Sequence, residues 1–334
     1  AVQPGKHAAP AKRQVAAWML SAPGLIGLLL FMVLPFCLAI ALSFTNYSLN
    51  SPLPLHWVGL ENYRRIFTDS SFVRGILNNL LFAAVVVPLQ TALALALAML
   101  VNQPLRGMVA FRTFFFMPVI YPMALVSVVW GLIFAPGESG MMNSLLETLT
   151  LGAWEPRDFL HHPYFALPAI MFMSIWQGVG FQMVVMLAGL QGIPDVLYEA
   201  ARIDRAGRWS RFWHVTLPQM RNTVIFVAMV TTILAFRLFD QVWILTQGGP
   251  RNATTTVMHE AYLASPERNQ VNLGSAMTVV FFLIVGAVAL LQHFSVRQER
   301  EKLPDTTWQQ AVNKARADYE RLVRELKEQG VADP

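Results

Sequence analysis

The chain has 334 residues, of which 55% are hydrophobic and only 13% are Asp, Glu, Lys or Arg. An ordinary soluble domain carries about 25% charged residues, so the composition excludes a soluble globular enzyme and a disordered protein. Long apolar stretches separate the charged residues, and about 20 apolar residues cross a bilayer as a helix. The sequence therefore predicts an all-α membrane protein with six transmembrane helices, over about 18–44, 76–101, 111–135, 165–190, 223–246 and 273–296.

The first apolar stretch follows Lys6, Lys12 and Arg13. It is much longer than the roughly 7–15-residue core of a signal peptide, and no small-x-small cleavage site follows it. We therefore expect this stretch to be retained as a membrane anchor. Cys37 is the single cysteine of the chain, which leaves no intramolecular disulfide possible.

The distribution of Lys and Arg predicts the orientation, because cytoplasmic segments carry an excess of both. The N-terminal tail, residues 1–17, has three, the segment between the second and third spans two, and the 191–221 loop five. The C-terminal tail, residues 297–334, has eight, whereas the segments on the opposite side have six together. We expect both termini in the cytoplasm. Because the basic residues are sorted by side of the membrane, nucleic acid is not an expected partner.

The 191–221 loop is the most informative segment. Pro194 and Asp195 predict a helix start, with proline in the first turn and an acid near the positive end of the dipole. Paired alanines beside the Glu199 carboxylate then give a flat face with one charged prong, and Gly207 can end that helix. A second amphipathic stretch follows. The loop is either a helix–turn–helix that inserts into a groove on a partner, or an interfacial connector.

Glu199-Ala200-Ala201, followed by Leu217-Pro218, resembles the "EAA" loop of permease subunits in binding-protein-dependent ABC importers. That pattern reads E-A-A, three residues, G, nine residues, I-x-L-P. Arg205 stands where the glycine is usual, and Val215 replaces the isoleucine.

Two further segments carry the resemblance. Residues 57–63, Trp-Val-Gly-Leu-Glu-Asn-Tyr, are similar to the F-V-G-L-x-N-Y pattern that follows the first span in sugar-importer permeases. Phe239-Asp240 with Leu-Thr-Gln-Gly-Gly-Pro at 245–250 resembles the F-D…L-T-x-G-G-P signature at the end of their fifth span. The resemblance covers about residues 18–296 and points to the carbohydrate, maltose-type group.

The resemblance implies a multi-pass protein of the bacterial inner membrane that forms half of the translocation path for a sugar, a di- or oligosaccharide. Implied partners are a second homologous permease, an ATPase dimer and an external solute-binding protein. The chain has no G-x-x-x-x-G-K-[ST] phosphate loop, so ATP and Mg²⁺ are expected on the ATPase, with no cofactor and no catalytic residue on this chain. The expected ATPase-coupling residues are Glu199, Ala200, Ala201, Asp204, Gly207, Leu217 and Pro218.

Arg237 and Asp240 interrupt the fifth apolar stretch. A charge at the centre of a membrane helix costs about 2.5–3.5 kcal/mol, so such residues usually face the bundle interior and pair. Three positions apart on a helix, the two side chains can meet. They form either a structural ion pair or part of the translocation path that hydrogen-bonds sugar hydroxyls. Candidate neighbours along the path are Phe236, Phe239 and Trp243 from this span, and Trp176, Gln177 and Gly180, with Gly178 and Gln182, from the fourth.

Other features carry less information. His161 and His162 lie near Asp158 without a further ligand at regular spacing, so no metal site is expected. The C-terminal tail predicts an amphipathic helix, which either rests in solvent or contacts the ATPase. An ion-coupled secondary transporter, kept as the alternative function, should show several membrane acids or an inverted repeat. A membrane enzyme should show a clustered catalytic set; the sequence shows neither feature.

Overall fold

The computed structural model describes residues 11–103, 107–138, 140–300, 317 and 321. These residues form helices, turns and loops, with one isolated antiparallel bridge between Thr45 and Trp57. The chain divides into two compact units, residues 1–286 and 287–334, and the packing described below belongs to the first. Most of the predicted C-terminal tail helix lies outside the described residues.

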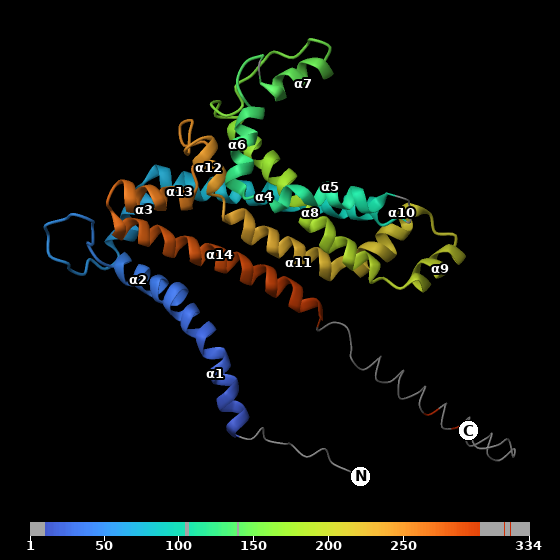
Figure 1. Cartoon of the computed structure of the whole chain (residues 1–334), viewed down its shortest axis with the longest axis horizontal. Helices are drawn as coiled ribbons and strands as arrows, with labels where there is room; N and C mark the ends of the chain where they lie inside the picture. Colours follow the sequence, from blue (N-terminus) through green and yellow to red (C-terminus); the bar gives the residue numbers. More distant parts are fainter. Residues whose placement is uncertain (1–10, 104–106, 139, 301–316, 318–320, 322–334) are drawn as a thin grey trace. The chain divides into compact units, whose positions relative to one another are not determined.

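Helices follow one another along the whole described chain (Figure 1). In order they are α1 (Ala11–Leu28), the π-helical η1 (Leu29–Val33), α2 (Leu34–Ser43), α3 (Glu61–Thr68), α4 (Ser70–Val101), α5 (Met108–Ile120), α6 (Met123–Ile133), α7 (Met141–Leu149), α8 (Ala166–Gln191), α9 (Asp195–Ile203), α10 (Arg208–Arg211), the π-helical η2 (Phe212–Thr216), α11 (Leu217–Phe236), α12 (Asp240–Leu245), α13 (Val257–Tyr262), the π-helical η3 (Leu263–Glu267) and α14 (Val271–Arg300).

Among the described residues, five helical segments are long and apolar enough to cross a membrane: Trp18–Ser43, Ser70–Val101, Ala166–Gln191, Arg208–Phe236 and Val271–Gln292. Helices α5 and α6 pass the same test together but meet at a bend of 100°. Counting that pair as one span gives six, as the sequence predicts. The bend falls at Pro122, which has no N–H to donate, and Tyr121 before it is extended, the backbone region that proline favours in its predecessor.

The fifth span differs from the prediction. Its helix begins in the 191–221 loop and ends at Phe236, instead of continuing as one helix to residue 246. The residues from Arg237 to Phe239 are not helical, and α12 then starts at Asp240. The two charged residues therefore flank a break in the helix rather than lying on one continuous helical face.

Helices α4, α8 and α11 pack around a common apolar cluster. Ala94 and Ala98 of α4 are fully buried in it against Met183 and Met186 of α8 and Met220 of α11. Small residues on one helix let neighbouring helices approach closely, which is the usual packing device between membrane helices. This cluster fixes α8 and α11, the two helices on which the candidate transport path is built.

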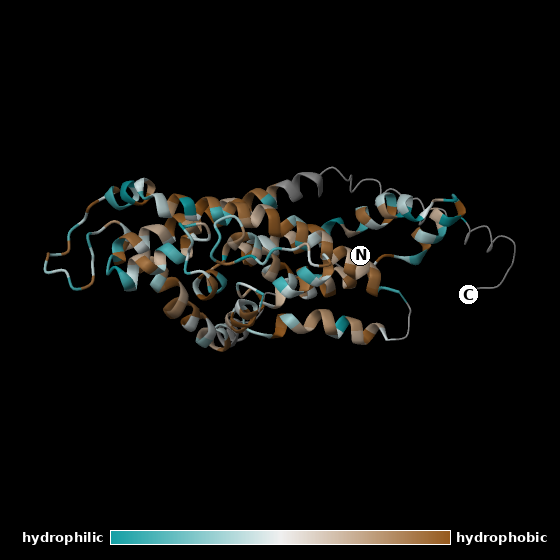
Figure 2. Cartoon of the chain, turned by 90° about the horizontal axis from the view of Figure 1, so that it is seen from above, coloured by the Kyte–Doolittle hydropathy of each residue, from teal (hydrophilic) through white to brown (hydrophobic). Residues whose placement is uncertain are grey.

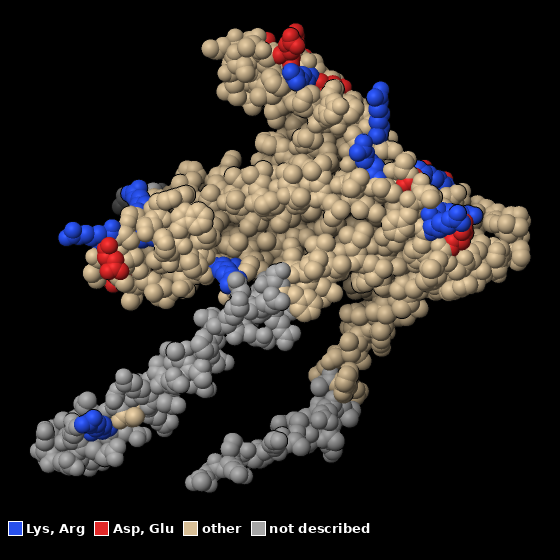
Figure 3. Space-filling view, turned by 180° about the vertical axis from the view of Figure 1, so that it is seen from behind, with Lys and Arg blue, Asp and Glu red and all other residues tan. Residues whose placement is uncertain are grey.

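A second cluster joins α3 and the start of α4 to α13 and α14, through Ile66, Phe72, Val257, Ala276 and Met277 among others. The first span is exposed along most of its length, and its Phe36 ring meets Phe282 of α14 at 4.5 Å between centroids. Apolar residues run along the long helices (Figure 2); α9 combines apolar residues such as Val196 and Ile203 with charged ones such as Glu199. Charged side chains gather around α3, on the α7 segment and around α9 and α10, with few between (Figure 3).

Candidate coupling loop and transport path

One face of α9 is fixed against the helical core. The Tyr198 hydroxyl lies 3.1 Å from the Thr216 hydroxyl of η2. Leu197 and Tyr198 also pack against the cluster shared by α4, α8 and α11. The helix is therefore anchored by its inward side chains, which leaves its opposite face free for another contact.

The outward face of α9 combines apolar side chains with one carboxylate. Val196 is 69% exposed and Ile203 is 82% exposed, and Glu199 and Ala200 lie exposed between them, with Ala201 half-buried. Within the described part of the chain, Glu199 has no hydrogen-bond or ion-pair partner. An apolar stripe exposed around an unpaired carboxylate is typical of a protein-docking surface.

The turn after α9 explains why Arg205 can stand where the EAA-loop pattern usually has a glycine. The helix ends with Asp204 as its C-cap, and Arg205 has a left-handed φ of 57°. The Arg205 N–H donates to the Arg202 carbonyl at 3.0 Å and the Ala206 N–H to the Ala201 carbonyl at 2.9 Å. These two bonds form a Schellman motif, whose left-handed residue is most often glycine. Arg205 therefore occupies the position where a glycine is physically favoured.

Gly207 has a different role from the one that the sequence suggests. Its φ of −66° is one that any residue adopts, and it precedes α10 as the N-cap rather than ending α9. Leu217 packs against the core cluster, and Pro218 is exposed in the first turn of α11. The second half of the loop thus runs directly into the fifth span as one helical segment.

Arg205→Gly should stabilise the loop by about 0.5–1 kcal/mol. The left-handed conformation costs a non-glycine residue roughly 1–2 kcal/mol, and part of that gain is lost because glycine loses more backbone entropy on folding. Hydrogen exchange of the α9 amides measures the change. Gly207→Ala is the matched control: its φ is ordinary and a Cβ there meets nothing within 4 Å, so protection should stay unchanged. Lower protection in Arg205→Gly would contradict this account of the turn.

The break in the fifth span places its two charges at helix ends. Arg237 is the C-cap of α11, and Asp240 is the first residue of α12. A cation at a helix C-terminus and a carboxylate at an N-terminus are both stabilised by the helix dipole. Both side chains are exposed, and no ion pair joins them in the part of the chain that the structure describes. The structural ion pair is therefore not formed here, and both groups are free to meet something else.

Two small cavities of about 110 and 80 Å³ lie beside this break, lined mostly by apolar side chains and by a few amides, with the hydroxyls of Ser174 and Thr231 in the smaller one. Gln177, predicted for the path, lines both, together with Gln90 and Gln182. The Gln182 amide donates to the Thr231 hydroxyl at 2.6 Å, and its buried carbonyl oxygen has no hydrogen-bond partner. Gly178 makes room for Gln90, since a Cβ there would overlap the Gln90 amide nitrogen. Buried amides with free hydrogen-bonding capacity suit a polyhydroxy ligand.

The other predicted path residues do not line these two cavities. Trp176 lines a larger apolar cavity of about 530 Å³ between α6 and α8. Gly180 allows α8 to contact α5, because a Cβ would overlap the Phe115 carbonyl. Phe236 is buried in the core, and Phe239 stacks on Trp243. Gln90 and Thr231 were not predicted, although the sequence could have indicated them, because they are polar residues inside apolar spans.

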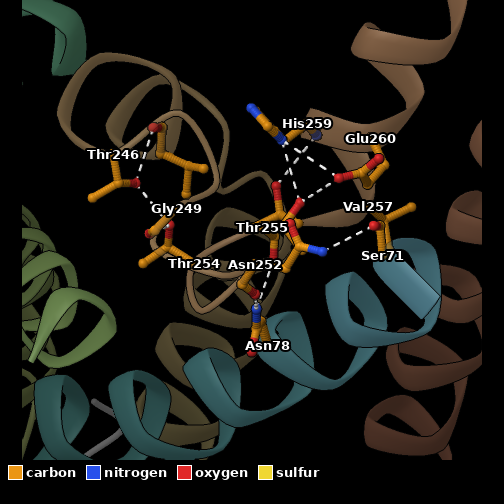
Figure 4. Close-up of polar contacts among 12 residues, drawn as sticks. Ser71, Asn78, Thr246, Gly249, Asn252, Thr254, Thr255, Val257, His259 and Glu260 are labelled. Atoms are coloured by element: carbon orange, nitrogen blue, oxygen red, sulfur yellow. Dashed lines mark hydrogen bonds and ion pairs between the residues drawn. The ribbon is translucent and has the colours of Figure 1, made fainter. Parts of the chain in front are cut away.

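Sequence reasoning also missed the polar cluster after the fifth span (Figure 4). The Thr255 hydroxyl donates to Glu260 at 2.7 Å, and Arg268 lies 3.5 Å from the other Glu260 oxygen. His259 is buried beside them, and its Nε2 has no hydrogen-bond partner. Gly248 has a left-handed φ of 81°, and a Cβ there would come within 2.7 Å of the His259 ring. Tight packing of the Gly-Gly-Pro turn thus encloses this histidine.

Burial lowers the pKa of His259, against a smaller opposing effect of the Glu260 carboxylate. The residue lies in α13, outside the candidate membrane spans. Because unfolded chains protonate this side chain more readily than the native protein does, acidification below the ordinary value of 6.5 stabilises the unfolded state. We therefore expect the melting temperature to fall from about pH 7.5 to about pH 5.

That fall should be smaller in His259→Gln than in the native protein, when thermal unfolding is followed in detergent at both pH values. His56→Gln, at an exposed histidine, is the matched control and should keep the native pH dependence. An equal loss of stability in all three proteins would show that His259 does not contribute.

The chain is similar to known proteins in both sequence and fold. Residues 68–300 match the family model described as the binding-protein-dependent transport system inner membrane component. The chain is 33% identical to the probable ABC transporter permease protein YurN of Bacillus subtilis, over 84% of this chain and 96% of that protein. It is 30% identical to the lactose transport system permease protein LacF of Rhizobium radiobacter, over 86% of this chain and 95% of that protein. Its fold is similar to that of a chain of a bacterial alginate ABC transporter, which was crystallised with an alginate pentasaccharide-bound periplasmic protein. The TM-score is 0.75 at 20% sequence identity, and the match covers 86% of this chain and 96% of that chain.

Proposed function

The chain belongs to the family of binding-protein-dependent transport system inner membrane components, and from that premise we propose that it forms half of the translocation path for a di- or oligosaccharide. It is a permease subunit of an ABC importer, a transport subunit rather than an enzyme. The sugar is supported by the names of relatives such as the lactose permease, and the Gln177 amide, which lines two small cavities, is a group that could hydrogen-bond a sugar hydroxyl.

The single observation that carries the coupling role is the outward face of α9. Glu199 stands unpaired between two exposed apolar side chains, Val196 and Ile203, on a helix whose other face is anchored in the core. We propose that the ATPase dimer binds this face, with Glu199 entering a groove and Ala200 allowing close approach. Asp204 caps the end of α9, Gly207 precedes α10 as its N-cap, and Leu217 and Pro218 connect the loop to the fifth span.

The transport path is proposed to run past the break in the fifth span. Arg237 and Asp240 are exposed there, and Gln177 faces the adjoining cavities. A guanidinium, a carboxylate and amides offer planar donors and acceptors that match sugar hydroxyls. The exposed side of this surface is then completed by a second homologous permease. Broken membrane helices at a substrate site are a recurrent arrangement in transporters.

The remaining assignments follow the same proposal. The protein lies in the bacterial inner membrane with both termini and the α9 loop in the cytoplasm, where the ATPase holds ATP and Mg²⁺. An external solute-binding protein delivers the sugar on the opposite side. The distribution of Lys and Arg supports this orientation.

Reconstitution tests the proposal. The solute retained by the external binding protein is identified first, and its labelled form is then offered to proteoliposomes that hold both permeases and the ATPase. Uptake should require ATP, the binding protein and this chain, and should persist when ionophores collapse the proton and sodium gradients. Uptake that needs an ion gradient instead of ATP would favour the ion-coupled alternative.

A further inference from the structure

Helix α11 ends inside the protein, and the carbonyl groups at its end need partners. The last turn of any α-helix leaves carbonyls without an intrahelical donor, and an unsatisfied backbone group within a membrane costs several kcal/mol. The Arg237 N–H donates to the Leu234 carbonyl at 3.1 Å. The carbonyls of Phe236 and Leu238 are instead met by side chains from distant parts of the chain.

Asn79 of α4 joins the α11 side of the break to the start of α13. Its side-chain amide donates to the Phe236 carbonyl at 3.4 Å, a long hydrogen bond, and its side-chain oxygen accepts from the Val257 N–H at 3.0 Å. Asn79 is only 1% exposed, so water does not compete for these bonds. One buried amide therefore holds both the end of α11 and the start of α13.

Thr256, the residue before α13, hydrogen-bonds a carbonyl within the break. Its hydroxyl donates to the Leu238 carbonyl at 2.9 Å and accepts from the His259 N–H at 3.3 Å, as the N-cap of α13. Gly75 allows this arrangement, because a Cβ there would lie 3.0 Å from the Thr256 carbonyl carbon. The 252–257 segment thus rests directly on α4 and reaches the break.

Asn78 provides a natural comparison, since it neighbours Asn79 on α4. Its amide donates to the carbonyls of Asn252 and Thr255 at 3.1 and 2.9 Å. A further bond joins Asn252 to Ser71 of α4 at 2.9 Å (Figure 4). These contacts hold the same segment on α4, but they do not reach the carbonyls at the break.

We propose that Asn79 and Thr256 are positioning residues that fix the helix break, so that Arg237 and Asp240 keep their exposed orientation. The start of α13 and the geometry of the break are then coupled through these two side chains, independently of the Asn78 contacts. The inference deepens the proposed function and rests on it for the claim that these two charges line the path. The proposed positioning itself is a matter of structure and can be measured without transport.

Thiol labelling in the assembled transporter tests the positioning. Cys37→Ser removes the only cysteine, and Arg237→Cys or Asp240→Cys then introduces a single probe that reacts with a maleimide. We expect Asn79→Ala to change the labelling rate of both probes by about fivefold, the effect of losing one or two ordinary hydrogen bonds. Asn78→Ala, the matched control, should leave the rate within about twofold.

Thr256 gives a second, isosteric test in case Asn79→Ala does not accumulate in the membrane. Thr256→Val keeps the shape but removes the hydroxyl, and it should change the labelling rate as Asn79→Ala does. Thr256→Ser keeps the hydroxyl and should restore the parent rate. A purely structural role would lower the membrane abundance of Thr256→Val without changing the labelling rate of the folded complex.

Unchanged labelling rates in both Asn79→Ala and Thr256→Val would overturn the proposal. The outcome is independent of the proposed function, because labelling does not require uptake. If labelling changes as expected but Arg237→Ala imports sugar normally, the positioning holds and the path role of the charges fails.

Discussion

Glu199→Arg should lower ATP-driven sugar uptake by at least about 30-fold while the transporter still reaches the membrane. In the proposed complex the Glu199 carboxylate enters a groove on the ATPase, and loss of one member of a buried, hydrogen-bonded charge pair at an interface costs about 2–5 kcal/mol. A free-energy cost of 1.4 kcal/mol corresponds to a tenfold change in affinity. ATP hydrolysis should persist but no longer respond to the loaded binding protein. Uptake and ATPase rates in proteoliposomes measure both effects.

Two variants sharpen this experiment. Glu199→Gln keeps the shape of the side chain and should lose less activity than the charge reversal. Glu147→Arg is the matched control, because it reverses another exposed acid near the end of a nine-residue helix, α7. It should leave assembly with the ATPase intact. A Glu199→Arg transporter that assembles and imports sugar at the native rate would refute the coupling role.

Arg237→Ala should lower sugar uptake by about tenfold or more at normal membrane abundance, because a hydrogen bond to a charged group contributes about 1.5–3 kcal/mol. The guanidinium is exposed at the break and unpaired with Asp240, so its removal leaves no buried partner behind. The loss should therefore appear in transport rather than in stability. Initial uptake rates, normalised to the amount of complex in the membrane, measure it.

Arg64→Ala is the control, since Arg64 is an exposed arginine of α3 away from the break. Arg237→Lys keeps the charge but not the planar fork of donors, and it should recover only part of the rate. Native uptake by Arg237→Ala would exclude this residue from the path.

The coupling loop shows how far local pattern reaches. Pro194, Asp195 and the Glu199-Ala200-Ala201 run predicted a helix with one charged prong, and α9 has that form with Glu199 exposed. The same pattern misassigned the turn, because the conformation of Arg205 depends on the carbonyls that its own helix end leaves unpaired. A left-handed arginine is rare, so residue preference alone favours the nearby Gly207.

The transport path shows where local pattern fails. Arg237 and Asp240 were read as neighbours on one helix face, and the apolar stretch around them gave no sign of a break. The break is stabilised by Asn79, whose partner Phe236 is 157 positions away, and by Thr256. Phe239 and Trp243 were predicted as neighbours of the charges along the path; the sequence did not indicate that their rings stack on one another.

The sequence by itself determined the membrane-spanning class, the family and the helix in the 191–221 loop, and its six spans match the structure when α5 and α6 are counted as one. These properties depend on composition, on sorted charges and on motifs that are contiguous in the chain. Only the tertiary structure decided which polar groups line the cavities beside the break, where the fifth span stops and how its orphan carbonyls are satisfied. Those features depend on hydrogen bonds between residues far apart in sequence, and within apolar spans such partners can be recognised only once the helices are packed together.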